Sequence, residues 1–339
     1  MKTMRKLLIT CAVAALVLAL GSTARAGTWN VPGDFDTIQE AIDLAVTGDV
    51  ILVGPGNYDG ATVTKAVEIK GEDGAIINGG PELGTSGLYQ GFRMQSGGDG
   101  ATISHLSFET VDFSIYSGGT DDVTVEHCTF TSPIQAITNW NGNGWNISHN
   151  VINGLRTKNG GGIGIFIGTR ASEESTANSN LITHNKITGE VVVPLDEIDD
   201  YNFPKPPYPD AGYSVVGICL MSDRRDGRPA GPITGNRILK NKVAISSNNP
   251  RNHFPGGIEL SDLGLSNSGS PDLLDNKVGF NDLRGMLDTV IEEPGAAKPT
   301  AILLYPDPLD PTNIISRNLG DDPNNRGHGG VHPQLLFEE

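Results

Sequence analysis

Residues 147–152 read ISHNVI, a phrase that recurs along the chain with an apolar residue first and Asn fourth. Related phrases are ISHLSF from Ile103, VEHCTF from Val125, ITHNKI from Ile182, ITGNRI from Ile233, LLDNKV from Leu273 and ISRNLG from Ile315. Successive phrases start 22, 22, 35, 51, 40 and 42 residues apart, so a 22-residue unit repeats and then acquires insertions. Repeats of this length are typical of a solenoid, in which each repeat packs on its neighbours.

Each phrase has the short alternation of a β-strand and is followed, after a turn rich in Gly, Asn or Ser, by a second short strand. No repeat shows a helical period, so the sequence predicts an all-β fold, a single-stranded parallel β-helix. We expect the first and sixth residues of each phrase in the core, and Asn at the fourth place in a tight bend where φ is often positive. The Asn side chains should form one ladder, made of Asn150, Asn185, Asn236, Asn276 and Asn318.

One helical pattern stands near the N-terminus, over residues 36–47. Asp36 is expected as the N-cap, with Gln39 three residues later, and Gly48 ends the pattern. The apolar face of this helix comprises Ile38, Ala41, Ile42 and Ala45. Because an open β-helix end exposes core and strand edges, we expect this amphipathic helix to cap the solenoid.

The chain divides into three segments by composition. Residues 1–26 have basic residues, an apolar run and a small-residue cleavage site, which predicts a secretory signal and a secreted or extracytoplasmic protein. Residues 27–320 form the predicted β-helix, and residues 321–339 a C-terminal tail. No later stretch approaches the roughly 20 apolar residues of a membrane span.

The charge balance excludes some partners. The chain has 24 Lys and Arg against 40 Asp and Glu, a formal net charge of −16. Such a surface repels nucleic acid and anionic membranes. An acidic polysaccharide is also repelled unless a local basic patch or a bound cation offsets the field. Outside the signal, Cys128 and Cys219 lie on different repeats, which favours two free thiols over a disulfide.

The stretch DFDTIQEAIDLAVTGDVILVGPGNYDG, from Asp34, resembles the opening of pectin-lyase-like right-handed parallel β-helix proteins. The later phrases resemble the repeats of NosD-like and carbohydrate-active members of that superfamily. The resemblance implies a right-handed β-helix and a polysaccharide as partner. Because the superfamily includes lyases, hydrolases, esterases, epimerases and non-enzymatic adhesins, it implies no single activity. Gly327-His328-Gly329 matches a motif of polygalacturonases, but we expect it in an irregular tail and not on a strand.

A candidate site follows from the position of the insertions. A second strand with a small residue before Ile follows each phrase, and insertions such as 191–213 and 222–231 flank it. Loops at both ends of one strand should wall in its outer face as a groove. Strand alternation places aromatic rings on the floor of this groove, where they would stack on sugars: Tyr116, Trp140, Phe166 and Tyr305.

Three successive coils carry a carboxylate just past this strand, namely Asp223, Asp262 and Asp307, and Glu259 lies on the floor. Coils stack about 4.8 Å apart, so these groups are candidates for catalytic acid and base. Asp223 and Asp262 are also candidate Ca²⁺ ligands.

Three arginines follow Asp223 in the same loop. We expect Arg224 and Arg225 to grip a uronate carboxylate during catalysis and Arg228 to bind substrate. The alternative is structural, with the Asp residues in turns and the arginines paired to Asp196, Asp199 and Asp200.

Four histidines occupy the third place of consecutive phrases: His105, His127, His149 and His184. They should stack in a column, which is either a plain surface stack or a transition-metal site.

Two functions remain open. The first is a secreted polysaccharide lyase or glycoside hydrolase that uses the loop-walled groove, with Ca²⁺ as a possible cofactor. The second is a non-catalytic β-helix that binds glycans or serves as a structural protein at the cell surface.

Overall fold

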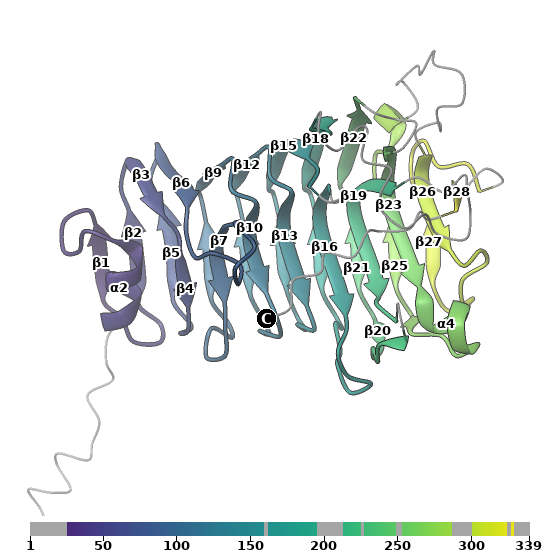
Figure 1. Cartoon of the computed structure of the whole chain (residues 1–339), viewed down its shortest axis with the longest axis horizontal. Coiled ribbons are helices and arrows are strands. Elements are labelled where there is room, and N and C mark those ends of the chain that lie inside the picture. Colours follow the sequence, from purple (N-terminus) through teal and green to yellow (C-terminus); the bar gives the residue numbers. More distant parts are fainter. Residues whose placement is uncertain are drawn as a thin grey trace, which may run out of the picture.

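The repeated phrases become strands that stack coil upon coil in the computed structural model of the chain (Figure 1). The structure describes residues 26–158, 162–194, 213–224, 227–248, 253–286, 300–323 and 327–328. Three long parallel sheets run along the solenoid, with ten, nine and seven strands. The predicted all-β, right-handed parallel β-helix is therefore confirmed.

Seven successive coils, from β2 to β23, contribute one strand to each long sheet in turn. The ten-stranded sheet comprises β1 (Thr28–Val31), β2 (Val50–Val53), β5 (Glu68–Gly71), β8 (Thr102–Ser104), β11 (Thr124–Glu126), β14 (Asn146–Ser148), β17 (Leu181–Thr183), β21 (Arg237–Leu239), β25 (Lys277–Gly279) and β27 (Ile314–Ser316). The seven-stranded sheet comprises β3 (Gly56–Asp59), β6 (Ala75–Gly79), β9 (Ser107–Glu109), β12 (Thr129–Thr131), β15 (Val151–Arg156), β18 (Lys186–Val192) and β22 (Lys242–Ser247). The nine-stranded sheet comprises β4 (Ala61–Val63), β7 (Gln90–Met94), β10 (Phe113–Ser117), β13 (Gln135–Trp140), β16 (Ile163–Thr169), β19 (Tyr213–Ser222), β23 (His253–Asp262), β26 (Thr300–Tyr305) and β28 (Gly327–His328). A short pair is formed by β20 (Ile233–Thr234) and β24 (Leu273–Leu274).

The core is built from columns of aliphatic side chains. In the nine-stranded sheet, one column is in direct register over six coils: Ile115, Ile137, Ile165, Ile218, Ile258 and Ile302. All six side chains are fully buried. The first and sixth residues of the founding phrase, Ile147 and Ile152, are also buried, as predicted. Each such side chain contributes about 1.5–3 kcal/mol through removal from water.

Asn side chains form two ladders where one was expected. The first runs through Asn150, Asn185, Asn241, Asn281 and Asn318. The second runs through Asn180, Asn236, Asn276 and Asn313. The prediction was wrong in merging them, because the motif Asn-x-apolar-x-x-Asn places two Asn turns five residues apart, one on each side of a three-residue strand.

Within a ladder, each Asn satisfies the polar groups of its neighbours. Asn185 Oδ1 accepts the backbone N–H and the Nδ2–H of Asn150, at 3.0 Å each. Asn185 Nδ2 donates to the carbonyl of Ile147 and to Asn241 Oδ1. The positive φ falls on the residue before the Asn, such as His184 at 56°, at every ladder position except Asn313, and not on the Asn as predicted.

A short helix, α2 (Ile38–Leu44), covers the N-terminal end of the stack (Figure 1). Its N-cap is Thr37, which forms a capping box with Glu40, so the predicted N-cap at Asp36 was wrong by one residue. The predicted apolar face is buried. At the other end, Lys65 Nζ donates to the carbonyls of Ile42, Asp43 and Ala45, which favours the helix by charge as well as by hydrogen bonding.

At the far end, the nine-stranded sheet continues beyond the expected boundary at residue 320. Gly327 and His328 form β28, which pairs with Leu303 and Leu304 of β26. The expectation that these residues lie off any strand was wrong. Among the described residues, no helix is both long enough and apolar enough to cross a membrane.

Candidate functional site

The outer face of the nine-stranded sheet carries the residues predicted to line a groove. Strand register makes a continuous row of Tyr116, Thr138, Phe166, Cys219, Glu259 and Leu303. None of these residues is more than 4% exposed. The expected open floor is therefore a packed surface, and part of its cover comes from Leu83 and Leu88 in the loop after β6.

This outer face forms a second apolar cluster, separate from the core of the solenoid. Its buried members are Leu83, Leu88, Phe113, Tyr116, Ile134, Trp140, Ile163, Phe166, Val216, Cys219, Met221 and Leu303. Cys128 and Cys219 are both buried and form no disulfide with each other, as predicted. Burial raises the pKa of Cys128 to about 12, so this thiol is inert at neutral pH.

The predicted row of carboxylates is broken by a one-residue offset. Asp262 pairs in register with Ser222, so Asp223 stands one residue further along its own coil. Since successive residues of a strand point to opposite faces, this offset separates the two carboxylates. The expected alignment of Asp223 with Asp262, on which the predicted pair of Ca²⁺ ligands was based, is therefore absent.

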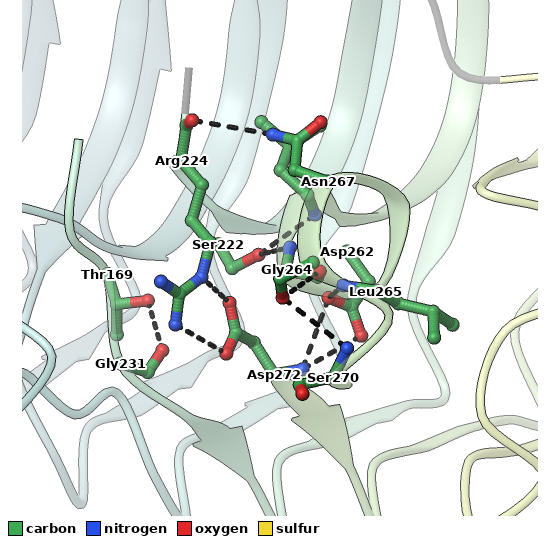
Figure 2. Close-up of polar contacts among 12 residues, drawn as sticks. Thr169, Ser222, Arg224, Gly231, Asp262, Gly264, Leu265, Asn267, Ser270 and Asp272 are labelled. Atoms are coloured by element: carbon green, nitrogen blue, oxygen red, sulfur yellow. Dashed lines mark hydrogen bonds and ion pairs between the residues drawn. The ribbon is translucent and has the colours of Figure 1, made fainter. Parts of the chain in front are cut away.

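Asp262 acts as a structural cap (Figure 2). It is the N-cap of α4 (Leu263–Ser268) and accepts hydrogen bonds from the backbone N–H groups of Leu265, Asp272 and Leu273. Its side chain is fully buried. Burial raises the pKa of Asp262, and the three backbone donors oppose that shift.

Arg224 is held between two carboxylates. Its Nε and Nη2 donate to Asp272 at 2.6 and 3.0 Å (Figure 2). Its Nη1 and Nη2 donate to Glu173 at 2.6 and 2.7 Å. These hydrogen bonds raise the pKa of the guanidinium further and occupy both of its edges. A bidentate grip on a uronate by Arg224 is therefore blocked, and the structural alternative holds, with partners other than those predicted.

The remaining predicted residues are dispersed. Asp307 is exposed in the bend after β26, whereas Asp223 is buried and has a partner. Glu259 is fully buried and accepts a 2.5 Å hydrogen bond from Ser261 Oγ. Tyr305 is half-buried, and its hydroxyl accepts a 3.3 Å hydrogen bond from Ser266.

Two of the three loop arginines remain without an assigned role. Arg228 is half-buried. Arg225 lies outside the described residues, as do Asp196, Asp199 and Asp200.

A cationic and aromatic cluster that the sequence reasoning missed lies at the end of β13 and β16. Arg170 follows β16, and its guanidinium carbon lies 4.4 Å from the centre of the Trp140 ring. Its Nη2 donates a 2.8 Å hydrogen bond to the Tyr116 hydroxyl. Trp140 in turn contacts Phe166, with ring centres 4.3 Å apart. The predicted aromatic residues Tyr116, Trp140 and Phe166 thus come together around a cation.

Arg170 differs from Arg224 in having donors to spare. No carboxylate among the described residues forms an ion pair with Arg170. In register it is the neighbour of Asp223, because Thr169 pairs with Ser222. The sequence did contain a signal for Arg170. An Arg that directly follows a strand, one coil from the predicted site residue Asp223, lies at the same edge of the sheet as that residue.

Metal ligands are not gathered in the described residues. No group of three or more His, Cys, Asp or Glu side chains there is arranged to hold a metal ion. The four histidines do stack, with ring centres 5.0–5.1 Å apart, on the exposed turn that joins the ten-stranded to the seven-stranded sheet.

Comparisons with known proteins bear on the fold. No family model matches the sequence, and no curated protein matches it. The chain is similar to the structure of an alginate lyase from Paenibacillus sp. str. FPU-7 (12% identity over 90% of this chain and 98% of that chain, TM-score 0.35). It is also similar to the catalytic domain of a GH87 alpha-1,3-glucanase (13%, 88% and 70%, TM-score 0.32) and to the A-module of mannuronan C-5 epimerase AlgE6 from Azotobacter vinelandii (13%, 86% and 98%, TM-score 0.32).

The likeness is one of fold. These structures belong to the pectin-lyase-like parallel β-helix class that the sequence resembles. At 12–13% identity and TM-scores of 0.32–0.35 they carry no argument about the site of this chain.

Proposed function

We propose that this protein is exported and binds an acidic polysaccharide at the edge of the nine-stranded sheet where β16 ends, with Arg170 as the carboxylate-binding residue. The observation that carries the proposal is the position of the Arg170 guanidinium, which is stacked on Trp140 and tethered to Tyr116. Polysaccharide as the partner class agrees with the resemblance of the sequence to carbohydrate-active β-helix proteins.

The chemistry of Arg170 suits a uronate. A guanidinium presents a planar fork of N–H donors that matches a carboxylate in two parallel hydrogen bonds. Stacking on Trp140 fixes the plane of the fork before a ligand arrives, which lowers the entropy lost on binding. The remaining N–H groups of Arg170 have no partner among the described residues, and the side chain is half-buried at the edge of the aromatic cluster.

The charge of the chain makes this position distinctive. With a net charge of −16, most of the surface repels an anionic polymer. At the edge of this buried aromatic cluster, a guanidinium that has no ion pair among the described residues supplies local attraction for an anionic polymer. We therefore place binding at Arg170 and not at Arg224, whose edges are occupied.

We propose binding without cleavage. Among the described residues, Asp262 is used as a helix cap and Glu259 is buried, so an acid and a base do not face a common space. The second candidate is a polysaccharide lyase, and one observation favours it, namely that Asp223 stands one coil from Arg170 in register.

A binding and cleavage screen separates these functions. The chain beginning at Gly27 is tested against acidic and neutral polysaccharides, with and without Ca²⁺, for retention and for new reducing ends. We expect retention of acidic polymers only, with no new reducing ends and no unsaturated product. If an unsaturated product forms and Asp223→Asn abolishes it, the protein is a polysaccharide lyase and the proposal of binding without cleavage is wrong.

Substitutions locate the binding site. Arg170→Ala should weaken binding at least about tenfold, and Arg170→Lys should restore part of it, since charge returns without the planar fork. Arg237→Ala is the matched control, because Arg237 is exposed on the ten-stranded sheet. Equal losses for Arg170→Ala and Arg237→Ala would contradict the proposal. Export is checked separately by N-terminal sequencing of protein recovered outside the cytoplasm, with Gly27 as the expected first residue.

A further inference from the structure

The exposed turn that leads from the ten-stranded to the seven-stranded sheet carries a continuous column of side chains, which we name the histidine ridge. From the N-terminal side, its members are His105, His127, His149, His184, Lys240, Phe280 and Arg317. Each has a φ between 54° and 59°, and all seven side chains are exposed. The ridge runs along the solenoid, so each coil contributes one side chain.

The imidazoles are regularly spaced. Neighbouring ring centres are 5.1, 5.0 and 5.0 Å apart, and the rings become more parallel along the ridge, with interplanar angles of 24°, 18° and 2°. Their edges face solvent because the turn is exposed. The spacing is that of the β-helix coils themselves.

Charges around the ridge are mainly positive at its C-terminal half. Lys186 and Lys242 are exposed, pair in register on β18 and β22, and lie two residues past His184 and Lys240. Asp282, the next residue in that row, is ion-paired to Arg284.

Acidic groups stand near the N-terminal half of the ridge. Glu126 of β11 directly precedes His127, and Glu109 stands further out on β9. The four histidines occupy this N-terminal half. Their protonation would extend the positive charge of Lys240 and Arg317 toward the N-terminal coils.

Backbone geometry does not require histidine in these turns. Lys240, Phe280 and Arg317 adopt the same positive φ at the later turns of the same column. The second ladder has the same turn, with positive φ before Asn180, Asn236 and Asn276, and Ser179 and Gly235 donate the same backbone hydrogen bond to the next coil. Its residues are the usual ones for this conformation: Gly100, Asp122, Gly144, Ser179, Gly235 and Asp275. Folding alone therefore does not account for the choice of histidine at these positions of the ridge.

We propose that the histidine ridge is a second binding site, gated by pH, for a polyuronate chain that lies along the solenoid axis. A polyuronate carries one carboxylate on each sugar, and once the histidines are protonated an extended chain would meet one cation on each coil of the ridge except the coil of Phe280. The protonated imidazole edge donates an N–H to a carboxylate oxygen, and Lys240, Lys186 and Lys242 add charge that persists at neutral pH. The site lies on a different corner of the solenoid from Arg170 and does not depend on the function proposed there.

The stack determines how the ridge responds to pH. Two unit charges 5 Å apart repel by about 0.8 kcal/mol in water, and the rings of His149 and His184 are at this distance. Burial, then His149 and Lys240, lowers the pKa of His184. A bound polyanion removes this repulsion, so binding takes up protons and strengthens as pH falls through the range of histidine titration.

The test measures affinity against pH for variants that keep the turn. His127→Asn with His149→Asn removes two imidazoles, and Asn adopts positive φ readily, so folding is preserved. The control is Ser179→Asn at the equivalent turn of the second ladder. Binding of polygalacturonate oligosaccharides to the chain beginning at Gly27 is measured from about pH 7.5 to 5 at fixed ionic strength, with a chelator present.

We expect wild-type affinity to rise about tenfold across this range, and the double variant to lose most of that rise while it keeps the weak affinity at neutral pH. Ser179→Asn should behave like wild type. Imidazole NMR resonances of the ridge should shift toward the protonated form when ligand is added.

Three outcomes would overturn the proposal. The first is an unchanged pH dependence in the double variant. The second is equal binding of a neutral glucan, and the third is equal binding of duplex DNA at matched charge. Arg170→Ala distinguishes the two sites, because it should weaken binding at every pH and leave the slope with pH intact.

Discussion

The two Asn-ladder turns of each coil have the same backbone and different surfaces. In both, a residue with positive φ precedes the ladder position and donates its N–H to the next coil, as His149 and Ser179 do. In both, buried Asn amides bond from coil to coil. The first turn displays His, Lys, Phe and Arg to solvent, whereas the second displays Gly, Asp and Ser.

This difference separates what the fold requires from what it tolerates. The Asn is required inside the turn because it satisfies backbone groups that water cannot reach. The preceding residue is free in size and charge, because its side chain points to solvent. A bias toward one chemistry at the free place, repeated over successive coils, is therefore a functional signal, whereas repetition of Asn is a structural one.

The largest expected effect tests whether the two ladders are equivalent. Asn185→Ala leaves the N–H of Asn150 and the carbonyl of Ile147 buried without their partners, and should destabilise the protein by about 2–4 kcal/mol. Asn236→Ala does the same in the second ladder, where Asn180 and Ala177 lose their partners, and should have a similar effect. Urea denaturation of both variants checks this.

The control for both ladders is Asn153→Ala, since Asn153 is exposed on β15 and should change stability by no more than about 0.5 kcal/mol. A large loss for one ladder substitution and a small loss for the other would break the comparison. The ladders would then differ in structure as well as in surface.

The sequence was sufficient for the fold because the fold is periodic. Apolar residues at fixed places and the recurring Asn predicted the coils, the core and the capping helix. The register between coils was harder to predict from the sequence than the strands themselves. ITGNRI from Ile233 and ILKNKV from Ile238 both fit the phrase, and only the pairing of β17 with β21 shows that the second continues the His184 column.

The candidate site was less predictable for the same reason. A single-residue offset between β19 and β23 moves Asp262 away from Asp223, and no local pattern reveals it. The contacts of Arg224 join residues 48 and 51 positions distant in sequence, which a repeat pattern does not specify. Arg170 could have been found, because it follows a strand at the same edge as Asp223.

The next effect concerns strain at the free place of each turn. Gly235 has a φ of 68°, and a Cβ added there would meet only Ser179 Oγ, at 3.8 Å, so Gly235→His should cost about 1–2 kcal/mol through backbone strain alone. Ser179→His should change stability by about 0.5 kcal/mol or less, since a residue with a side chain already adopts this conformation there. Thermal denaturation of the two variants measures the difference. Equal losses would show that the second turn rejects histidine for a reason other than strain.

The smallest effect separates the turns by pH. Because the pKa of His184 is lowered in the folded protein, the unfolded chain binds more protons near pH 6.5, and stability falls as pH drops below that value. His184→Asn should lessen this fall and should stabilise the protein relative to wild type at mildly acidic pH, with little change at neutral pH. Ser179→Asn removes no titrating group and should keep the wild-type dependence. Melting temperatures from about pH 7.5 to 5.5 give the comparison. If His184→Asn and wild type lose stability in parallel, the ridge does not accumulate repulsion on protonation, and its coupling to a polyanion would lose its physical basis.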